Sequence, residues 1–142
     1  MYKFTLILSL ICSTHIFSQE IETCYLRGIV NDLKELETNN NPKAIGDNGR
    51  AYGVLQIHKI CVKDVNRIYG TNFSHKDAFI PHKAEAIALL YLKEGIRLFK
   101  KKYNKLPTDE EIVRMWNGSI YSGFKKRSTK WYYKKYLKIV NK

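Results

Sequence analysis

Apolar residues recur at helical spacing in several segments of the chain, and this pattern predicts a mostly helical protein. Between 21 and 36 they fall every three or four residues, as on one face of an amphipathic helix. The same spacing returns at 57–68, where Gly70 is a typical C-terminal stop. It returns again from 81 to about 102, where Pro81 suits the first turn of a helix. We therefore expect three helices in the first hundred residues.

The C-terminal part of the chain predicts two more helices. Thr108 and Glu111 have the spacing of a capping box, so we expect a short helix to begin there and to end at Gly118. From 125 to 142 a last helix is expected, with an apolar edge formed by Tyr132, Tyr136 and Ile139.

A turn-rich stretch, residues 37–57, separates the first two predicted helices. It contains Asn-Pro, Gly-Asp-Asn-Gly and Tyr-Gly, which are typical turn sequences. Apolar anchors such as Leu55 argue against disorder, and long ordered loops are usually functional. Strand signals are weak, and we expect the β structure to be a small hairpin within 44–56. The stretch therefore predicts an ordered cleft wall with Glu37 at one end and Gln56 at the other.

Three short motifs occur in order along residues 22–140. Residues 37–44 read Glu-Thr-Asn-Asn-Asn-Pro-Lys-Ala, residues 52–57 read Tyr-Gly-Val-Leu-Gln-Ile, and residues 115–118 read Met-Trp-Asn-Gly. They resemble, respectively, the Glu-Ser-x-x-Asn-Pro-x-Ala, Gly-Leu-Met-Gln and Ala-Tyr-Asn-x-Gly motifs of soluble-lytic-transglycosylase-like domains. Residues 47–53 also resemble the matching loop of goose-type lysozymes. Each motif alone is weak, and their order within one domain is what makes the resemblance specific.

The resemblance implies a lysozyme-like fold for residues 19–142: one mostly α domain with a small β-like loop or hairpin lining the active-site cleft. It also implies an enzyme that cleaves the MurNAc–GlcNAc β-1,4 bond of peptidoglycan glycan strands, without cofactor or metal, as a monomer. Glu37 matches the family's catalytic acid. Glycoside cleavage needs a proton donor whose pKa is raised, typically by an apolar pocket, and Glu37 follows an apolar helix. The alternative is an ordinary solvated glutamate at a helix end.

Asp47 is the only acid inside the loop and is the candidate second catalytic residue. It matches an acid of the goose-type pattern, whose other aspartate is replaced here by His58. If Asp47 positions water, the protein is a lysozyme-type hydrolase; if it only braces an Asx-turn, it has no catalytic role. Lytic transglycosylases need no second acid, because the muramyl 6-hydroxyl attacks and gives a 1,6-anhydro product. We favour internal attack, because only Glu37 has a clear motif role.

Five further residues are candidate substrate contacts, two amides for hydrogen bonds to acetamido groups and hydroxyls, and three aromatic rings for stacking on sugar faces. They are Gln56, Asn117, Tyr52, Trp116 and Tyr132. Residues 129–132 also resemble a family Thr-x-x-Tyr motif whose tyrosine approaches the catalytic glutamate. The alternatives are capping or bracing for the amides and core packing for the rings.

Residues 1–18 resemble a secretory signal peptide, with Lys3 before a short apolar run and Ser18 at a suitable cleavage point. The run is too short to span a bilayer, so we expect export to the periplasm or the medium and no stable membrane insertion. The alternative is a buried N-terminal helix. In an oxidising compartment Cys24 and Cys61 are free to pair, but their expected distance along the fold favours two buried thiols.

The chain carries a formal net charge of +12, which favours polyanionic partners. Export makes the anionic cell wall the expected partner and argues against nucleic acid. Residues 125–142 contain eight Lys or Arg and no acid. This segment leaves open a non-enzymatic alternative, a basic protein that binds the cell wall.

Overall fold

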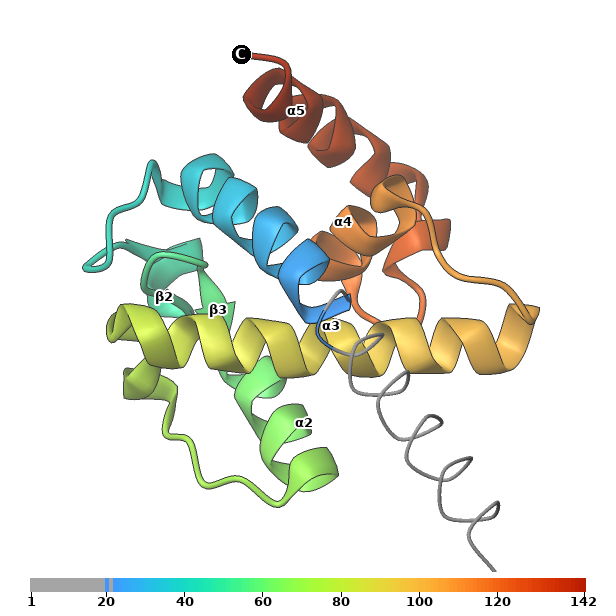
Figure 1. Ribbon diagram of the computed structural model, residues 1–142. Coiled ribbons are helices and arrows are strands. Elements are labelled where there is room, and N and C mark those ends of the chain that lie inside the picture. The colour runs from blue at the N-terminus through green and yellow to red at the C-terminus, as the bar shows by residue number, and fades with distance from the viewer. Residues whose placement is uncertain (1–19, 21) are drawn as a thin grey trace, which may run out of the picture.

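The computed structural model describes residue 20 and residues 22–142, which form a mostly helical fold with one small antiparallel sheet (Figure 1). The expected signal peptide lies outside the described residues. The first helix, called here the N-terminal helix, spans 22–38. The other helices are α2 (Lys59–Tyr69), α3 (Pro81–Tyr103), α4 (Asp109–Gly118) and α5 (Lys130–Val140), and the strands are β1 (Ile45–Gly46), β2 (Ala51–Tyr52) and β3 (Ile57–His58).

Helix α3 is the long central element, and the other helices and the sheet lie around it (Figure 1). Its buried positions include Ala84, Ile87, Ala88 and Tyr91, which fall on the predicted apolar face. Gly95 on the same helix allows a close approach, because an added Cβ would lie 2.9 Å from Ile120 Cγ2. The segment after α4 therefore packs directly on the backbone of α3.

The sheet forms in the turn-rich stretch, as a three-stranded meander. β1 pairs with β2 through Ile45 and Tyr52, and β2 pairs with β3 through Ala51 and His58. The predicted hairpin is thus present, and a third strand extends it to the start of α2. Gly53, with φ of 72°, lies so close to the 3-10 turn at His75–Phe79 that an added Cβ would be 1.7 Å from the Ala78 carbonyl oxygen.

Two helix boundaries differ from the prediction. The N-terminal helix continues to residue 38, so Glu37 lies in its last turn instead of following it. The stop is made by Asn39 and Asn40, which adopt left-handed φ values of 51° and 64°. The last helix begins at Lys130 instead of 125, because the preceding residues form two short 3-10 turns.

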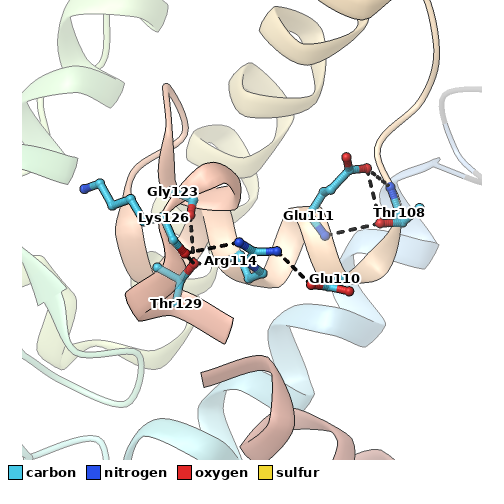
Figure 2. Close-up of polar contacts among 7 residues, drawn as sticks. All are labelled: Thr108, Glu110, Glu111, Arg114, Gly123, Lys126 and Thr129. Atoms are coloured by element: carbon cyan, nitrogen blue, oxygen red, sulfur yellow. Dashed lines mark hydrogen bonds and ion pairs between the residues drawn. The ribbon is translucent and has the colours of Figure 1, made fainter. Parts of the chain in front are cut away.

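A buried arginine fixes those turns against α4 (Figure 2). Arg114 donates from Nε to Thr129 Oγ1 at 3.0 Å and from Nη2 to the Lys126 carbonyl at 3.1 Å, and its Nη1 pairs with Glu110 at 2.7 Å. Thr129 Oγ1 also lies 2.8 Å from the Gly123 carbonyl oxygen. An unpaired buried guanidinium is costly, so these contacts hold the start of α5 in one position on α4.

The predicted capping box is present at the start of α4 (Figure 2). Thr108 N–H donates to Glu111 Oε2 at 2.8 Å, and Glu111 N–H donates to Thr108 Oγ1 at 3.3 Å.

The two described cysteines are free, as expected, but only Cys61 is buried. Cys24 is exposed because it lies two residues before Leu26, and so almost on the other side of the helix from the buried stripe. None of the helices in the described part of the chain is long and apolar enough to cross a membrane.

Candidate active site

A cavity of about 400 Å³ opens where the N-terminal helix, the sheet and helices α2, α3 and α4 meet. Its lining includes most of the residues that the sequence singles out, which come from segments far apart in the chain: Glu37, Asp47, Gln56, Trp116 and Asn117. His58, Cys61 and Tyr91 also line it. A concave site in which a few polar groups converge beside aromatic side chains is a typical candidate for ligand binding.

Glu37 is held by two hydrogen bonds to the same oxygen. Trp116 Nε1 donates to Glu37 Oε1 at 3.1 Å, and the Tyr132 hydroxyl donates to the same atom at 2.5 Å. Within the described residues Oε2 has no hydrogen-bond partner. A neutral carboxyl accepts at one oxygen and carries its proton on the other, so Oε2 is the oxygen positioned to donate.

Burial raises the pKa of the Glu37 carboxyl above its ordinary value. The hydrogen bonds from Tyr132 and Trp116, and the positive charge of Lys135, partly oppose this rise in pKa. Burial and the neighbouring Glu37 charge raise the pKa of Tyr132, which keeps its hydroxyl protonated as a donor. The arrangement therefore retains a proton on Glu37 to higher pH than a solvated glutamate would.

Tyr132 reaches Glu37 because α5 is placed on α4 by the Arg114–Thr129 contacts. Its side chain is buried and is not part of the cavity lining. This position therefore does not suit a ring that stacks on a sugar face. It suits a residue that orients Glu37. The proximity agrees with the motif resemblance at residues 129–132.

Asp47 lies in the cavity wall with both carboxylate oxygens engaged. Oδ1 pairs with Arg50 Nη2 at 2.8 Å, and Oδ2 lies 3.4 Å from His58 Nε2. Asp47 itself has φ of 47°, and its carbonyl accepts from the Arg50 backbone N–H at 3.2 Å. It therefore braces a turn and lines the cavity as well, so both interpretations of this residue have structural support.

Gln56 is fixed by its backbone neighbours. It adopts φ of 50°, and its Nε2 donates to the Gly53 carbonyl at 3.0 Å. Gly46 leaves room for the amide, since an added Cβ there would lie 1.9 Å from Gln56 Oε1. Left-handed backbone at a residue other than glycine is often found at functional sites. Asn117, at the end of α4, is exposed at the cavity rim.

Tyr52 does not line the cavity, contrary to the prediction from sequence. Its ring stacks on His75 at 4.0 Å between ring centroids and on Phe79 at 4.8 Å. Its side chain points to the other face of the short strand because neighbouring positions alternate. This placement fits the alternative of core packing.

His58 and Tyr91 are cavity residues to which the sequence assigns no role. Tyr91 makes an edge contact with Trp116, with centroids 6.2 Å apart. Its place on the apolar face of α3 gives no sign that it borders a cleft. His58 could have been suspected, because it lies only two residues after Gln56 in the motif region.

Comparison with known proteins gives no matching family model, no similar curated protein and no similar solved structure. The motifs and the geometry of the cavity are therefore the features that point to a function. Within the described residues, no group of three or more His, Cys, Asp or Glu side chains is placed to hold a metal ion.

Proposed function

We propose that the protein is an exported, lysozyme-like enzyme that cleaves peptidoglycan glycan strands at the MurNAc–GlcNAc β-1,4 bond. The observation that supports this most is the state of Glu37: a carboxyl group of raised pKa on a cavity wall, held by Trp116 and Tyr132 with one oxygen unpaired. Such a group can protonate the oxygen that leaves when a glycosidic bond breaks.

The other cavity residues suit the binding of an amino sugar. The side-chain amides of Gln56 and Asn117 offer donors and acceptors for acetamido and hydroxyl groups. Trp116 and Tyr91 give the wall aromatic surface. In the proposed reaction Glu37 gives its proton to the leaving O4 as the C1–O4 bond breaks. It then takes the proton of the muramyl 6-hydroxyl as the O6–C1 bond forms, so the product carries a 1,6-anhydro ring.

Hydrolysis on the same fold is the second candidate, and one observation favours it. Asp47 and His58 share the cavity with Glu37, so the site has more than one group able to position a water molecule. The two candidates differ in their product, because hydrolysis leaves a reducing end and internal attack leaves an anhydro end.

The test is Glu37→Gln, which keeps the shape of the side chain and its acceptor for Trp116 and Tyr132. Clearing of a suspension of purified peptidoglycan should slow by about a hundredfold or more, because a general acid contributes at least this much. Glu35→Gln is the matched control. Glu35 precedes Glu37 by two residues, pairs with Lys142 and is absent from the cavity lining.

Both variants should give the circular dichroism spectrum of the parent protein. Full clearing by a folded Glu37→Gln protein would reject the enzymatic proposal. It would favour the basic cell-wall-binding alternative.

A further inference from the structure

His58 ends β3, and its ring lines the same cavity as Glu37. Nε2 lies 3.4 Å from Asp47 Oδ2, and within the described residues the ring has no other ion pair or hydrogen bond. In the neutral tautomer that carries its proton on Nε2, the nitrogen beside Asp47, Nδ1 keeps its lone pair. The ring therefore combines an orienting acid with a nitrogen that is free to accept a proton.

Asp47 is less suited than His58 to take a proton from a substrate or a water molecule. Arg50 holds its Oδ1 at 2.8 Å and also donates from Nε to the Asp47 carbonyl at 3.1 Å, which clamps the residue in its turn. The remaining oxygen faces His58. An imidazole with a free ring nitrogen can act as a general base, and the Asp47 carboxylate beside Nε2 favours the tautomer that carries its proton there.

We propose that His58, oriented by Asp47, is a general base that gives the enzyme a hydrolytic branch beside internal attack. The inference rests on the proposed function, since it needs Glu37 to protonate the leaving oxygen. In this branch Nδ1 takes one proton of a water molecule, the water oxygen bonds to C1, the C1–O4 bond breaks, and Glu37 gives its proton to O4. The imidazolium and the Glu37 carboxylate then return to their starting states by proton exchange with solvent.

The two branches place different demands on the site. Internal attack uses a hydroxyl that the sugar itself supplies, and Glu37 is already a base once it has given up its proton. Water is not tethered to the sugar, so it needs a group that both positions and deprotonates it. Loss of the basic nitrogen should therefore remove one product and leave the other.

The experiment digests purified peptidoglycan with the full chain and resolves the products by liquid chromatography and mass spectrometry. Reducing ends are heavier than 1,6-anhydro ends by one water molecule. The parent protein should release both kinds. In His58→Gln, whose amide keeps a donor toward Asp47 but accepts no proton, the rate of reducing-end formation should fall about a hundredfold. The rate of anhydro-end formation should fall much less, so the ratio of anhydro ends to reducing ends should rise.

Two further variants sharpen the result. His58→Asn should behave as His58→Gln does, and it provides a second folded protein if the first is unstable. His82→Gln is the matched control, because His82 is an exposed histidine in the first turn of α3 outside the cavity lining. It should release both products at the parent rates.

Anhydro ends as the sole product of the parent protein would reject the His58 branch and leave the role of Glu37 intact. An equal loss of both products in folded His58→Gln would also reject it, because that pattern is what a structural role predicts. Absence of both products from the parent digest would reject the proposed function, and the His58 branch with it.

Discussion

The Tyr132 hydroxyl donates to Glu37 Oε1 at 2.5 Å, joining the last helix to the last turn of the first described one. The basic C-terminal segment therefore does more than present charge to solvent. It carries, on the inner face of α5, one of the two donors that set the orientation of the candidate acid. The second donor, Trp116, comes from α4, on which α5 is packed.

Removing that donor should change the pH profile as well as the rate. In Tyr132→Phe we expect activity at the optimum to fall roughly ten- to a hundredfold, since hydrogen bonds to charged groups contribute roughly 1.5–3 kcal/mol. The bond lowers the pKa of Glu37, so its loss raises that pKa further. A general acid is active while protonated, and the alkaline limb of the profile should move to higher pH.

Tyr133→Phe is the control for this change. Tyr133 is the neighbouring residue, it is partly buried, and no hydrogen bond of its hydroxyl is found within the described residues. Its pH profile should match that of the parent. A Tyr132→Phe limb that moves to lower pH would contradict the geometry described for Glu37.

The stability of the protein should depend on the charge of Glu37. Its pKa is raised in the folded state, so the native protein holds this proton to higher pH than the unfolded chain does. The free energy of unfolding should therefore fall as pH rises. The fall begins near the pKa of this carboxyl group in the unfolded chain, about 4.5, and ends above its raised pKa in the folded protein. Glu37→Gln should raise the melting temperature above that window, and the difference should vanish in acid. A variant that melts lower than the parent at pH 8 would contradict this sign.

The position of the Gln56 amide should depend on Gly46. In Gly46→Ala the new Cβ would overlap Gln56 Oε1, so the amide must leave its place on the cavity wall. We expect a several-fold rise in KM from the loss of about one hydrogen bond, worth roughly 1 kcal/mol. Gly28→Ala is the control, because nothing lies within 4 Å of the added Cβ and alanine favours the helix by about 1 kcal/mol. An unchanged KM in folded Gly46→Ala would exclude the amide from binding.

The two described cysteines should differ in reactivity. Cys24 is exposed, whereas Cys61 is buried in the cavity wall, where burial raises the pKa of its thiol and limits access to it. A thiol-alkylating reagent should modify Cys24 in the native protein and Cys61 only after unfolding. Peptide mapping by mass spectrometry under non-reducing conditions checks this. Resistance of both thiols, with a mass lower by two hydrogens, would indicate a disulfide instead.

The outer face of α5 should support binding to the cell wall. Lys134, Lys135 and Lys138 are exposed and form no ion pair within the described residues. Replacing all three by Gln should weaken pelleting with insoluble peptidoglycan at low salt. The difference should shrink at high salt, because exposed charges are screened beyond about 10 Å at 0.1 M.

Three exposed lysines on other helices provide the charge-matched control for the α5 variant: Lys63, Lys93 and Lys101. Their replacement by Gln removes the same charge and should reduce pelleting less. Equal losses in the two triple variants would show that net charge, and not the surface of α5, determines binding.

Local sequence signals predict local features of this protein well. Gly70 does end α2, and Thr108 and Glu111 do form a capping box, because these features depend on residues within one turn of each other. The exposure of Cys24 was mispredicted, because the buried stripe of its helix runs through Leu26 and not through Cys24.

Contacts between residues far apart in the chain could be predicted from the sequence only where a motif resemblance indicated them. The approach of Tyr132 to Glu37 follows from the resemblance at residues 129–132. The burial of Arg114 against Thr129 and the contact of His58 with Asp47 have no such marker. A charged residue on a helix is usually solvated, and only the packing of residues 126–129 on α4 buries Arg114. His58 stays partly exposed at the end of β3, and the turn of the meander brings Asp47 beside it.

The bond between Tyr132 and Glu37 also sets an order of assembly. Its partners lie 95 residues apart in the chain, and the later one lies on α5. During synthesis, Glu37 is made long before the hydroxyl that orients it. A shortened chain that ends before α5, or one cut within the turns that Arg114 secures, would keep the glutamate but not its orientation. Competence for the proposed chemistry is thus delayed until α5 has been made and has packed on α4.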